Sequence, residues 1–211
     1  MSENKRGKFI TFEGCDGCGK STQLRLFSEY LTKEGKPHIF TREPGGGKIS
    51  EEIRGILLNG KNMEMTDECE ALLYAAARVQ HLSDSVEPAL SAGKTVVCDR
   101  YVDSSFAYQA YARGLGEDFI AKINAYALEK YLPDATVFID LTPEDAFKRK
   151  HGADENDRLE QAGLEFHKRV YAGYKLLAEK YPERFICVDG KQTPKQIFEE
   201  TKAKLQQRGC L

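Results

Sequence analysis

A glycine-rich segment near the start of the chain limits most strongly what this sequence can fold into. Residues 14–21 read GCDGCGKS, which fits the pattern G-x-x-x-x-G-K-[ST] of a phosphate-binding loop. The segment follows an apolar run at 9–12 and precedes a helix-forming run at 22–27, which is the context that such a loop requires. The alternative is a glycine-rich turn that binds nothing, and the matching elements on both sides argue against it.

The residues of this loop predict how it would bind a triphosphate. Its glycines let successive backbone N–H groups point at phosphate oxygens, and the N-terminal end of the following helix adds positive potential. In this pattern Lys20 reaches the β- and γ-phosphates, and the Ser21 hydroxyl binds Mg²⁺. The residues expected to bind the triphosphate are Gly14, Cys15, Asp16, Gly17, Cys18, Gly19, Lys20, Ser21 and Thr22.

The rest of the chain alternates between short apolar runs and helix-forming stretches. The apolar runs are 9–12, 38–41, 95–98, 136–141 and 185–188, and each is continuous, which is typical of strands buried on both faces. This alternation predicts an α/β fold, a doubly wound, five-stranded parallel sheet with helices on both faces. Thr-Pro pairs at 142–143 and 193–194 predict helix starts. With no linker in its 211 residues, the chain is expected to form one domain, 1–211.

Charge and hydropathy exclude several classes of partner. The net charge of −2 gives no overall basic field, so we expect no nucleic-acid polymer as a partner. No run of 18 apolar residues predicts a membrane span, and residues 1–6 lack the apolar core of a signal peptide. We therefore expect a cytoplasmic protein that does not enter membranes.

Cys15 and Cys18 form a C-x-x-C pair, which also occurs in redox sites and as half of a zinc site. No second pair supplies further ligands, and both cysteines occupy variable positions of the phosphate-binding loop. Free thiols are the favoured interpretation. A thiol facing a helix N-terminus is expected to have a lowered pKa and to oxidise easily.

The carboxyl ends of the predicted strands are where ligands gather in such folds. Asp99 and Arg100 follow the run 95–98; there, the acid can hold Mg²⁺ through water and the arginine can clamp a phosphate. Tyr74 and Arg78 are four residues apart on a helical stretch, so they share one face and suit a nucleobase. A core tyrosine beside a surface arginine is the more frequent arrangement, and the residues alone leave both possibilities open.

A charged stretch at 148–158 is basic at both ends and rich in loop-forming residues in the middle. It can be a solvated connection between helices. In a phosphoryl-transfer enzyme, a mobile lid with charge-neutralising arginines is expected in such a place. We place this lid at about 148–160.

Taken together, these motifs resemble the thymidylate kinase family over nearly the whole chain. The stretches that carry the resemblance are 12–22, 41–46, 74–78, 99–109 with 112–115, and 157–160 with Phe166 and 173–174. The resemblance implies transfer of the γ-phosphoryl group of ATP to dTMP, giving dTDP and ADP, with Mg²⁺ as cofactor. It also implies a homodimer, which the residues themselves do not show.

The resemblance also implies roles for single residues. Asp16 contacts the sugar and helps to arrange the metal and the acceptor phosphate, while Arg100 clamps that phosphate. Tyr74 stacks on the base, Arg78 bonds the thymine edge, and Tyr108 crowds a ribose 2′-hydroxyl. The implied catalytic residues are Lys20, Asp16, Arg100, Arg149 and Arg158; the implied acceptor-binding residues are Asp16, Glu43, Arg54, Tyr74, Arg78, Arg100, Ser105, Tyr108 and Gln109; the implied metal-binding residues are Ser21 and Asp99.

Three positions depart from the family pattern. Gly17 stands where some members carry a catalytic arginine, so the cation is expected from the lid, at Arg149 and Arg158. Tyr74 stands where phenylalanine is usual, and Gly47 replaces a usual threonine.

Two competing functions remain. One is another nucleoside monophosphate or deoxynucleoside kinase, and the other is a P-loop switch that binds nucleotide to recruit a partner. A GTPase switch carries an Asn-Lys-x-Asp motif, which this sequence lacks.

Overall fold

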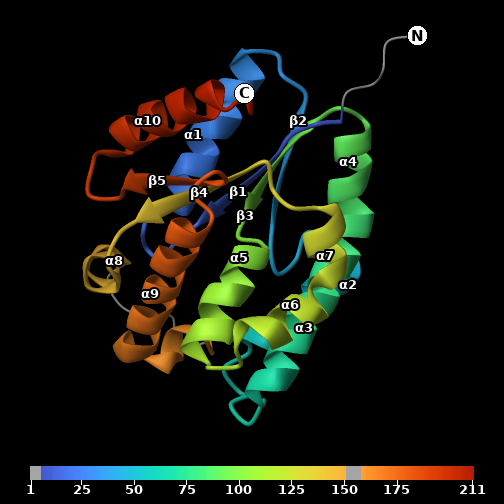
Figure 1. Ribbon diagram of the computed structural model, residues 1–211, viewed down its shortest axis with the longest axis vertical. Helices are drawn as coiled ribbons and strands as arrows, with labels where there is room; N and C mark the ends of the chain where they lie inside the picture. Colours follow the sequence, from blue (N-terminus) through green and yellow to red (C-terminus); the bar gives the residue numbers. More distant parts are fainter. Residues whose placement is uncertain (1–5, 151–157) are drawn as a thin grey trace.

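The computed structural model describes residues 6–150 and 158–211. Its centre is a five-stranded sheet in the order β2-β3-β1-β4-β5, in which every pair of neighbouring strands is parallel (Figure 1). The predicted parallel α/β fold is therefore confirmed. The strands are β1 (Phe9–Glu13), β2 (His38–Arg42), β3 (Thr95–Asp99), β4 (Ala135–Asp140) and β5 (Phe185–Asp189).

Helical segments connect the strands. They are α1 (Lys20–Lys33), α2 (Lys48–Leu58), α3 (Asp67–His81), η1 (Leu82–Val86), α4 (Glu87–Ser91), α5 (Val102–Ser105), η2 (Phe106–Ala112), α6 (Glu117–Ile123), α7 (Ala125–Lys130), α8 (Pro143–Lys150), η3 (Glu160–Ala162), α9 (Leu164–Lys180) and α10 (Pro194–Gln207). Of these, η1 and η2 are π-helical and η3 is a 3₁₀ turn.

The sheet separates two apolar cores, because successive strand residues point to opposite faces. On one face α1 and α10 pack together (Figure 1). There, Phe27 of α1 lies against Phe12 of β1 with ring centroids 5.4 Å apart. On the other face α4, α5, η2 and α9 cover the sheet, and Phe9 packs edge-on against Tyr101 at 4.8 Å. Helices therefore cover both faces, as predicted.

The prediction that every strand is buried on both faces is wrong for two of the five. The side chains of β1 are fully buried, whereas those of β2 are only half-buried, and Arg42 is exposed. In β5, Cys187 and Asp189 are exposed. The physical reason is the strand order, which makes β2 and β5 the edges of the sheet.

Both predicted Thr-Pro helix starts are confirmed. Thr193 precedes α10 and forms a capping box with Gln196, in which each residue bonds the backbone of the other. At the start of α8, the Thr142 hydroxyl accepts a bond from the Asp145 N–H at 3.4 Å. These caps supply partners for N–H groups that the first helical turn leaves unpaired.

Within the part of the chain that the structure describes, none of the helices combines the length and the apolar character needed to cross a bilayer.

Candidate active site

The phosphate-binding loop connects β1 to α1, as the sequence predicted. Gly17 and Gly19 have φ angles of 84° and 107°, in a region that side-chain-bearing residues rarely adopt. At Gly14, with φ of 140°, an added Cβ would lie 2.8 Å from Cys18 Sγ and 2.9 Å from the carbonyl oxygen of Ile139. The loop conformation therefore requires these glycines.

Lys20 is the first residue of α1, and its side chain is folded against the loop. Its Nζ donates to the carbonyl oxygens of Gly14 at 3.0 Å and Cys15 at 3.2 Å, and lies 4.0 Å from Asp16 Oδ1. Only 7% of the residue is exposed. The loop thus holds an ammonium group beside the amides that would cradle a phosphate.

The expectation of a lowered cysteine pKa in this loop is wrong. Cys15 and Cys18 are buried free thiols, and burial raises the pKa of Cys15 to about 12 and that of Cys18 above its usual range. The cations of Lys20 and Arg100 act in the opposite direction but are outweighed by burial. Both side chains lie beneath the loop in the core between the sheet and α1, where a thiolate is poorly solvated. In the described ranges, no group of three or more His, Cys, Asp or Glu side chains could hold a metal ion.

A cavity of about 450 Å³ extends from this loop across the carboxyl ends of the central strands. This volume suits a small-molecule ligand, since such pockets commonly measure roughly 300–1,000 Å³. The predicted residues that line it are Asp16, Gly17, Gly19, Lys20, Ser21, Thr22, Glu43, Arg54, Tyr74, Arg78, Asp99, Arg100, Ser105, Tyr108 and Gln109. The structure therefore brings most of the predicted donor residues and all of the predicted acceptor residues into one cavity, whereas Gly14, Cys15 and Cys18 do not line it.

Arg78 lines this cavity and is only 2% exposed. Its Nε donates to Glu43 Oε2 at 2.7 Å, and its Nη1 donates to Asn124 Oδ1 at 2.5 Å and to Ser105 Oγ at 3.0 Å. Its Nη2 donates to the carbonyl oxygen of Tyr101 at 3.2 Å. These bonds use four of its five N–H groups and leave one on Nη2. A surface arginine, one of the two arrangements that the sequence left open, is therefore excluded.

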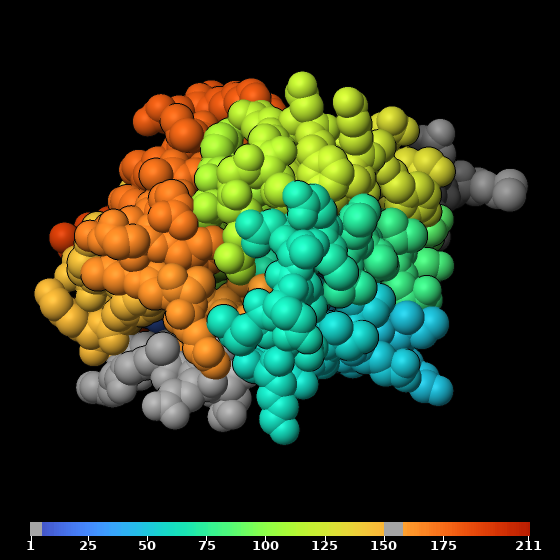
Figure 2. All heavy atoms as spheres, turned by 90° about the horizontal axis from the view of Figure 1, so that it is seen from below, coloured from blue at the N-terminus to red at the C-terminus, as the bar shows by residue number. Residues whose placement is uncertain are grey.

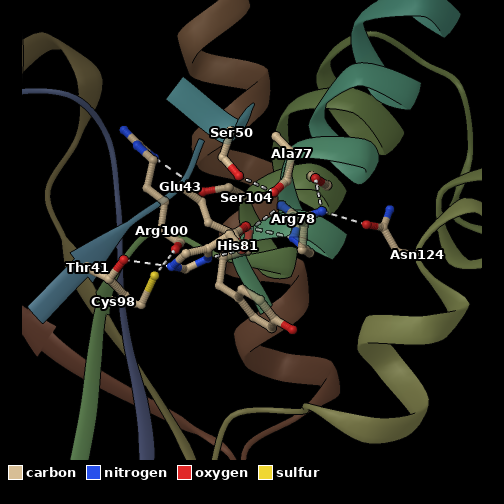
Figure 3. Close-up of polar contacts among 12 residues, drawn as sticks. Thr41, Glu43, Ser50, Ala77, Arg78, His81, Cys98, Arg100, Ser104 and Asn124 are labelled. Carbon is tan, nitrogen blue, oxygen red and sulfur yellow. Dashed lines mark hydrogen bonds and ion pairs between the residues drawn. The ribbon is translucent and has the colours of Figure 1, made fainter. Parts of the chain in front are cut away.

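Glu43 is in turn fixed by a second contact. His81 Nδ1 lies 2.9 Å from Glu43 Oε1, and His81 Nε2 lies 2.6 Å from Thr41 Oγ1, so these side chains form a chain of polar contacts behind Arg78 (Figure 3). Sequence reasoning missed both His81 and Asn124. His81 is three residues after Arg78 on α3, which was the only local sign that the two share a face.

Arg100 also lines the cavity. Its Nη2 donates to Asp16 Oδ1 at 2.7 Å, its Nη1 donates to Tyr174 Oη at 3.1 Å, and its guanidinium lies over the Tyr108 ring at 5.2 Å. Although burial opposes the charge of Asp16, the Arg100 and Lys20 cations hold the pKa of that carboxyl well below its usual range. The site is thus strongly charged even without a ligand.

Gln109 is oriented by Glu70, a fully buried carboxylate that the sequence analysis did not single out. Gln109 Nε2 donates to Glu70 Oε1 at 2.7 Å, and Glu70 Oε2 accepts from Arg113 at 2.9 Å and from Arg158. Arg158 is 4% exposed and also donates to the carbonyl oxygen of Leu57. Arg158 is therefore held at Glu70 Oε2, whereas Gln109 bonds the other oxygen of this carboxylate.

Neither predicted lid arginine lines the cavity. Arg149 is exposed on α8, and Arg158 is buried against Glu70. Residues 151–157 of the predicted lid lie outside the described residues.

The positions of Ser21 and Asp99 in the cavity are compatible with the predicted Mg²⁺ site. Both line the cavity, and Asp99 Oδ1 is buried without a hydrogen-bond partner among the described residues. A buried carboxylate oxygen is costly unless it is paired or binds a metal, and Mg²⁺ prefers oxygen ligands.

A phosphate-binding loop that follows a central parallel strand and adjoins a cavity lined by further arginines is typical of P-loop nucleotide kinases. The sequence model of one family, thymidylate kinase, matches residues 12–201. The chain is 49% identical to a thymidylate kinase of Bacillus pumilus over 92% of each chain, and 47% identical to one of Clostridium novyi over 93% of this chain and 97% of the relative. It is 50% identical to one of Caldanaerobacter subterraneus over 89% of each chain. The chain belongs to the thymidylate kinase family.

Proposed function

We propose that this enzyme transfers the γ-phosphoryl group of ATP to dTMP, giving dTDP and ADP. The observation that carries the proposal is the cavity that Lys20 of the phosphate-binding loop, Arg78 and Arg100 line together. Phosphoryl transfer between two anions needs alignment and neutralisation of their repulsion more than covalent chemistry from the protein. A cavity lined by these three cations meets that need.

On the donor side, the amides of residues 14–22 bind the ATP phosphates, and Lys20 leaves its loop carbonyls to contact the β- and γ-oxygens. Ser21 and Asp99 would hold Mg²⁺, Asp99 through water; when bound, Mg²⁺ neutralises charge on the phosphates. Asp16 orients Arg100 through their 2.7 Å bond and contacts the acceptor sugar.

On the acceptor side, the half-buried Tyr74 stacks on thymine, and the remaining Nη2 N–H of Arg78 bonds its edge. Ser105, Gln109, Glu43 and Arg54 complete this pocket. Arg54 is fixed there because its Nη1 donates to the carbonyl oxygen of Pro44 at 2.9 Å. The Tyr108 ring lies against the sugar, and Arg100 binds the acceptor phosphate. A base acceptor atom facing Arg78 and a monophosphate facing Arg100 are then the features that select dTMP.

The chain acts as one P-loop kinase domain with a lid at about 148–160. Arg149 and Arg158 are the proposed lid cations, which stabilise charge during transfer while lid closure excludes water. Arg158 can reach the phosphates only after its ion pair with Glu70 opens.

An acceptor panel tests this function. With ATP and Mg²⁺, ADP release should be fast with dTMP and at least about 100-fold slower with dAMP, dGMP or dCMP, because their base edges mismatch a pocket built around Arg78. Faster turnover of another monophosphate would assign the enzyme to a different nucleotide kinase. ATP hydrolysis that no acceptor accelerates would instead favour a nucleotide-dependent switch.

The family resemblance carries two further proposals, a cytoplasmic location and a homodimer. An apolar surface on α2 and α3 supports the dimer. Ile49 and Ile56 of α2, like Leu72 and Val79 of α3, are seven residues apart, and each is 43–51% exposed. The two helices pack against each other and form adjoining parts of one face (Figure 2). Paired apolar residues at this spacing form a stripe that a second copy can cover.

We expect Ile56→Glu combined with Leu72→Glu to convert the dimer into a 23.8 kDa monomer, because two carboxylates would be buried in the interface. Light scattering on an eluting column measures the mass. Leu176→Glu on α9, at a residue 50% exposed on another helix, is the matched control and should leave the mass unchanged. A wild-type protein that elutes as a monomer contradicts the dimer.

A further inference from the structure

Glu13 is a fully buried carboxylate at the end of β1, directly before the phosphate-binding loop, and none of the roles above uses it. Its Oε1 accepts from the Tyr101 N–H at 2.8 Å. Its Oε2 accepts from Ser104 Oγ at 2.6 Å and from Tyr174 Oη at 2.7 Å. A buried carboxyl group requires such partners, but these three donors also have a feature in common.

All three donors of Glu13 adjoin Arg100. The Tyr101 N–H belongs to the next residue of the chain, so Glu13 holds the backbone on one side of Arg100. The Ser104 and Tyr174 hydroxyl oxygens lie 3.4 Å and 3.1 Å from Arg100 Nη1, so the same carboxylate orients the hydroxyls that this guanidinium contacts. Ser104 Oγ and Tyr174 Oη are themselves 2.8 Å apart, which closes the network.

The backbone of Arg100 needs such support. Its φ angle is 66°, and it is the only non-glycine residue with positive φ among the described residues. A side-chain-bearing residue in this region costs about 1 kcal/mol or more and persists where its surroundings hold it. Here the Arg100 N–H bonds the carbonyl oxygen of Phe12, while Glu13 bonds the N–H of Tyr101. The residues immediately before the phosphate-binding loop therefore fix the backbone on both sides of Arg100.

We propose that Glu13 and Tyr174 are positioning residues that hold the Arg100 guanidinium at the angle at which it binds the acceptor phosphate. The inference rests on the proposed role of Arg100 in the transfer to dTMP. Without this support, the guanidinium keeps its bond to Asp16 and its place over the Tyr108 ring but loses the contacts that fix its other nitrogen.

The charge of Glu13 is consistent with this role. Burial, with a further contribution from Asp103, raises the pKa of Glu13 to about 7, against the lowering effects of Arg100 and the two hydroxyl bonds. The ionised form of Glu13 is the one in which both oxygens accept these three bonds, so Arg100 and the hydroxyls favour it.

Tyr174→Phe tests the inference, and Tyr171→Phe is its matched control. Tyr171 lies one turn earlier on α9 and also bonds a carboxylate, since its Oη donates to Asp140 Oδ1 at 2.7 Å. We expect Tyr174→Phe to weaken dTMP binding by about 10- to 150-fold in calorimetry, which is the size of one hydrogen bond at a charged group. Binding of thymidine, which has no phosphate, should stay within about twofold. Tyr171→Phe should leave both affinities unchanged.

Glu13→Gln provides a second measurement. The amide keeps the shape of the side chain, but its NH₂ group faces either the Tyr101 N–H or the two hydroxyls, so one side of the network is lost. We expect the KM for dTMP to rise at least as much as in Tyr174→Phe, with the KM for ATP within about threefold of wild type. If Glu13→Gln folds poorly, the dTMP and thymidine affinities of Tyr174→Phe test the inference without it.

Two results would overturn the positioning role. One is dTMP binding by Tyr174→Phe that matches Tyr171→Phe, and the other is an equal loss of thymidine and dTMP binding, which indicates a collapsed pocket. Failure of the proposed function looks different, because the wild-type enzyme would then bind no dTMP or show no dTMP-dependent ADP release.

Discussion

Replacing Lys20 with alanine is expected to lower the turnover of dTMP by about 100- to 1,000-fold. This is the usual loss when one preorganised donor that stabilises transition-state charge is removed. Lys20 is suited to the role because it is held at the loop by two carbonyl oxygens, at 3.0 and 3.2 Å, which it can exchange for phosphate oxygens. Initial rates of ADP release at saturating ATP and dTMP give the measurement.

The fold should survive this change. The hydrogen bonds of the Lys20 side chain go to carbonyls of its own loop, and Asp16, 4.0 Å away, keeps its bond to Arg100, so the melting temperature should move by only a few degrees. Lys33→Ala, at the exposed end of the same helix, is the control and should leave turnover unchanged. Turnover of Lys20→Ala near that of Lys33→Ala would remove Lys20 from the mechanism.

The fold could be predicted from local pattern to a large extent. The five apolar runs each fall within one residue of an observed strand at either end, because strands of a parallel sheet are rich in consecutive apolar residues even where, as in β2 and β5, they are only partly buried. The phosphate-binding loop could also be predicted, because its backbone geometry requires glycines at a fixed spacing. The order of the strands could not be predicted from the sequence, and the exposure of β2 and β5 follows from that order.

The environments of the site residues were less predictable. The residues alone left the burial of Arg78 open because arginine is usually a surface residue, and nothing near it in the sequence reveals Glu43, 35 residues earlier, or Asn124, 46 residues later. The same holds for Glu70, whose partners Gln109 and Arg158 come from other parts of the chain. The thiol of Cys15 was misjudged because its position in the loop was known and its burial was not.

Arg78→Ala is expected to lower both stability and acceptor affinity. Arg78 and Glu43 are 2% and 4% exposed, and removal of the guanidinium leaves the Glu43 carboxylate buried with His81 as its remaining side-chain partner. Breaking a buried pair from one side costs about 3–5 kcal/mol, which corresponds to a fall in melting temperature of roughly 10 °C in a chain of this size. Thermal unfolding followed by circular dichroism gives the measurement.

An exposed pair of the same type provides the control for stability. Arg25 bonds Glu29 on the surface of α1, where the two side chains are 63% and 60% exposed, so Arg25→Ala should change stability by less than about 0.5 kcal/mol. If Arg78→Ala is as stable as Arg25→Ala, the buried pair does not support the fold.

The effect of Arg78→Ala on binding separates its role in the acceptor pocket from its role in stability. Measured well below the melting temperature, this variant should raise the KM for dTMP far more than the KM for ATP, because Arg78 belongs to the proposed acceptor pocket and Lys20 to the phosphate-binding loop. A second variant, Arg78→Lys, further separates the effect on stability from the effect on dTMP binding. An ammonium can keep a charge beside Glu43 and recover part of the stability, but it cannot reproduce the planar guanidinium that bonds Glu43, Ser105 and Asn124 together. The KM for dTMP should therefore stay high in Arg78→Lys while the melting temperature rises toward that of wild type. Equal changes in the two KM values would show that Arg78 supports the cavity as a whole and does not recognise the acceptor base.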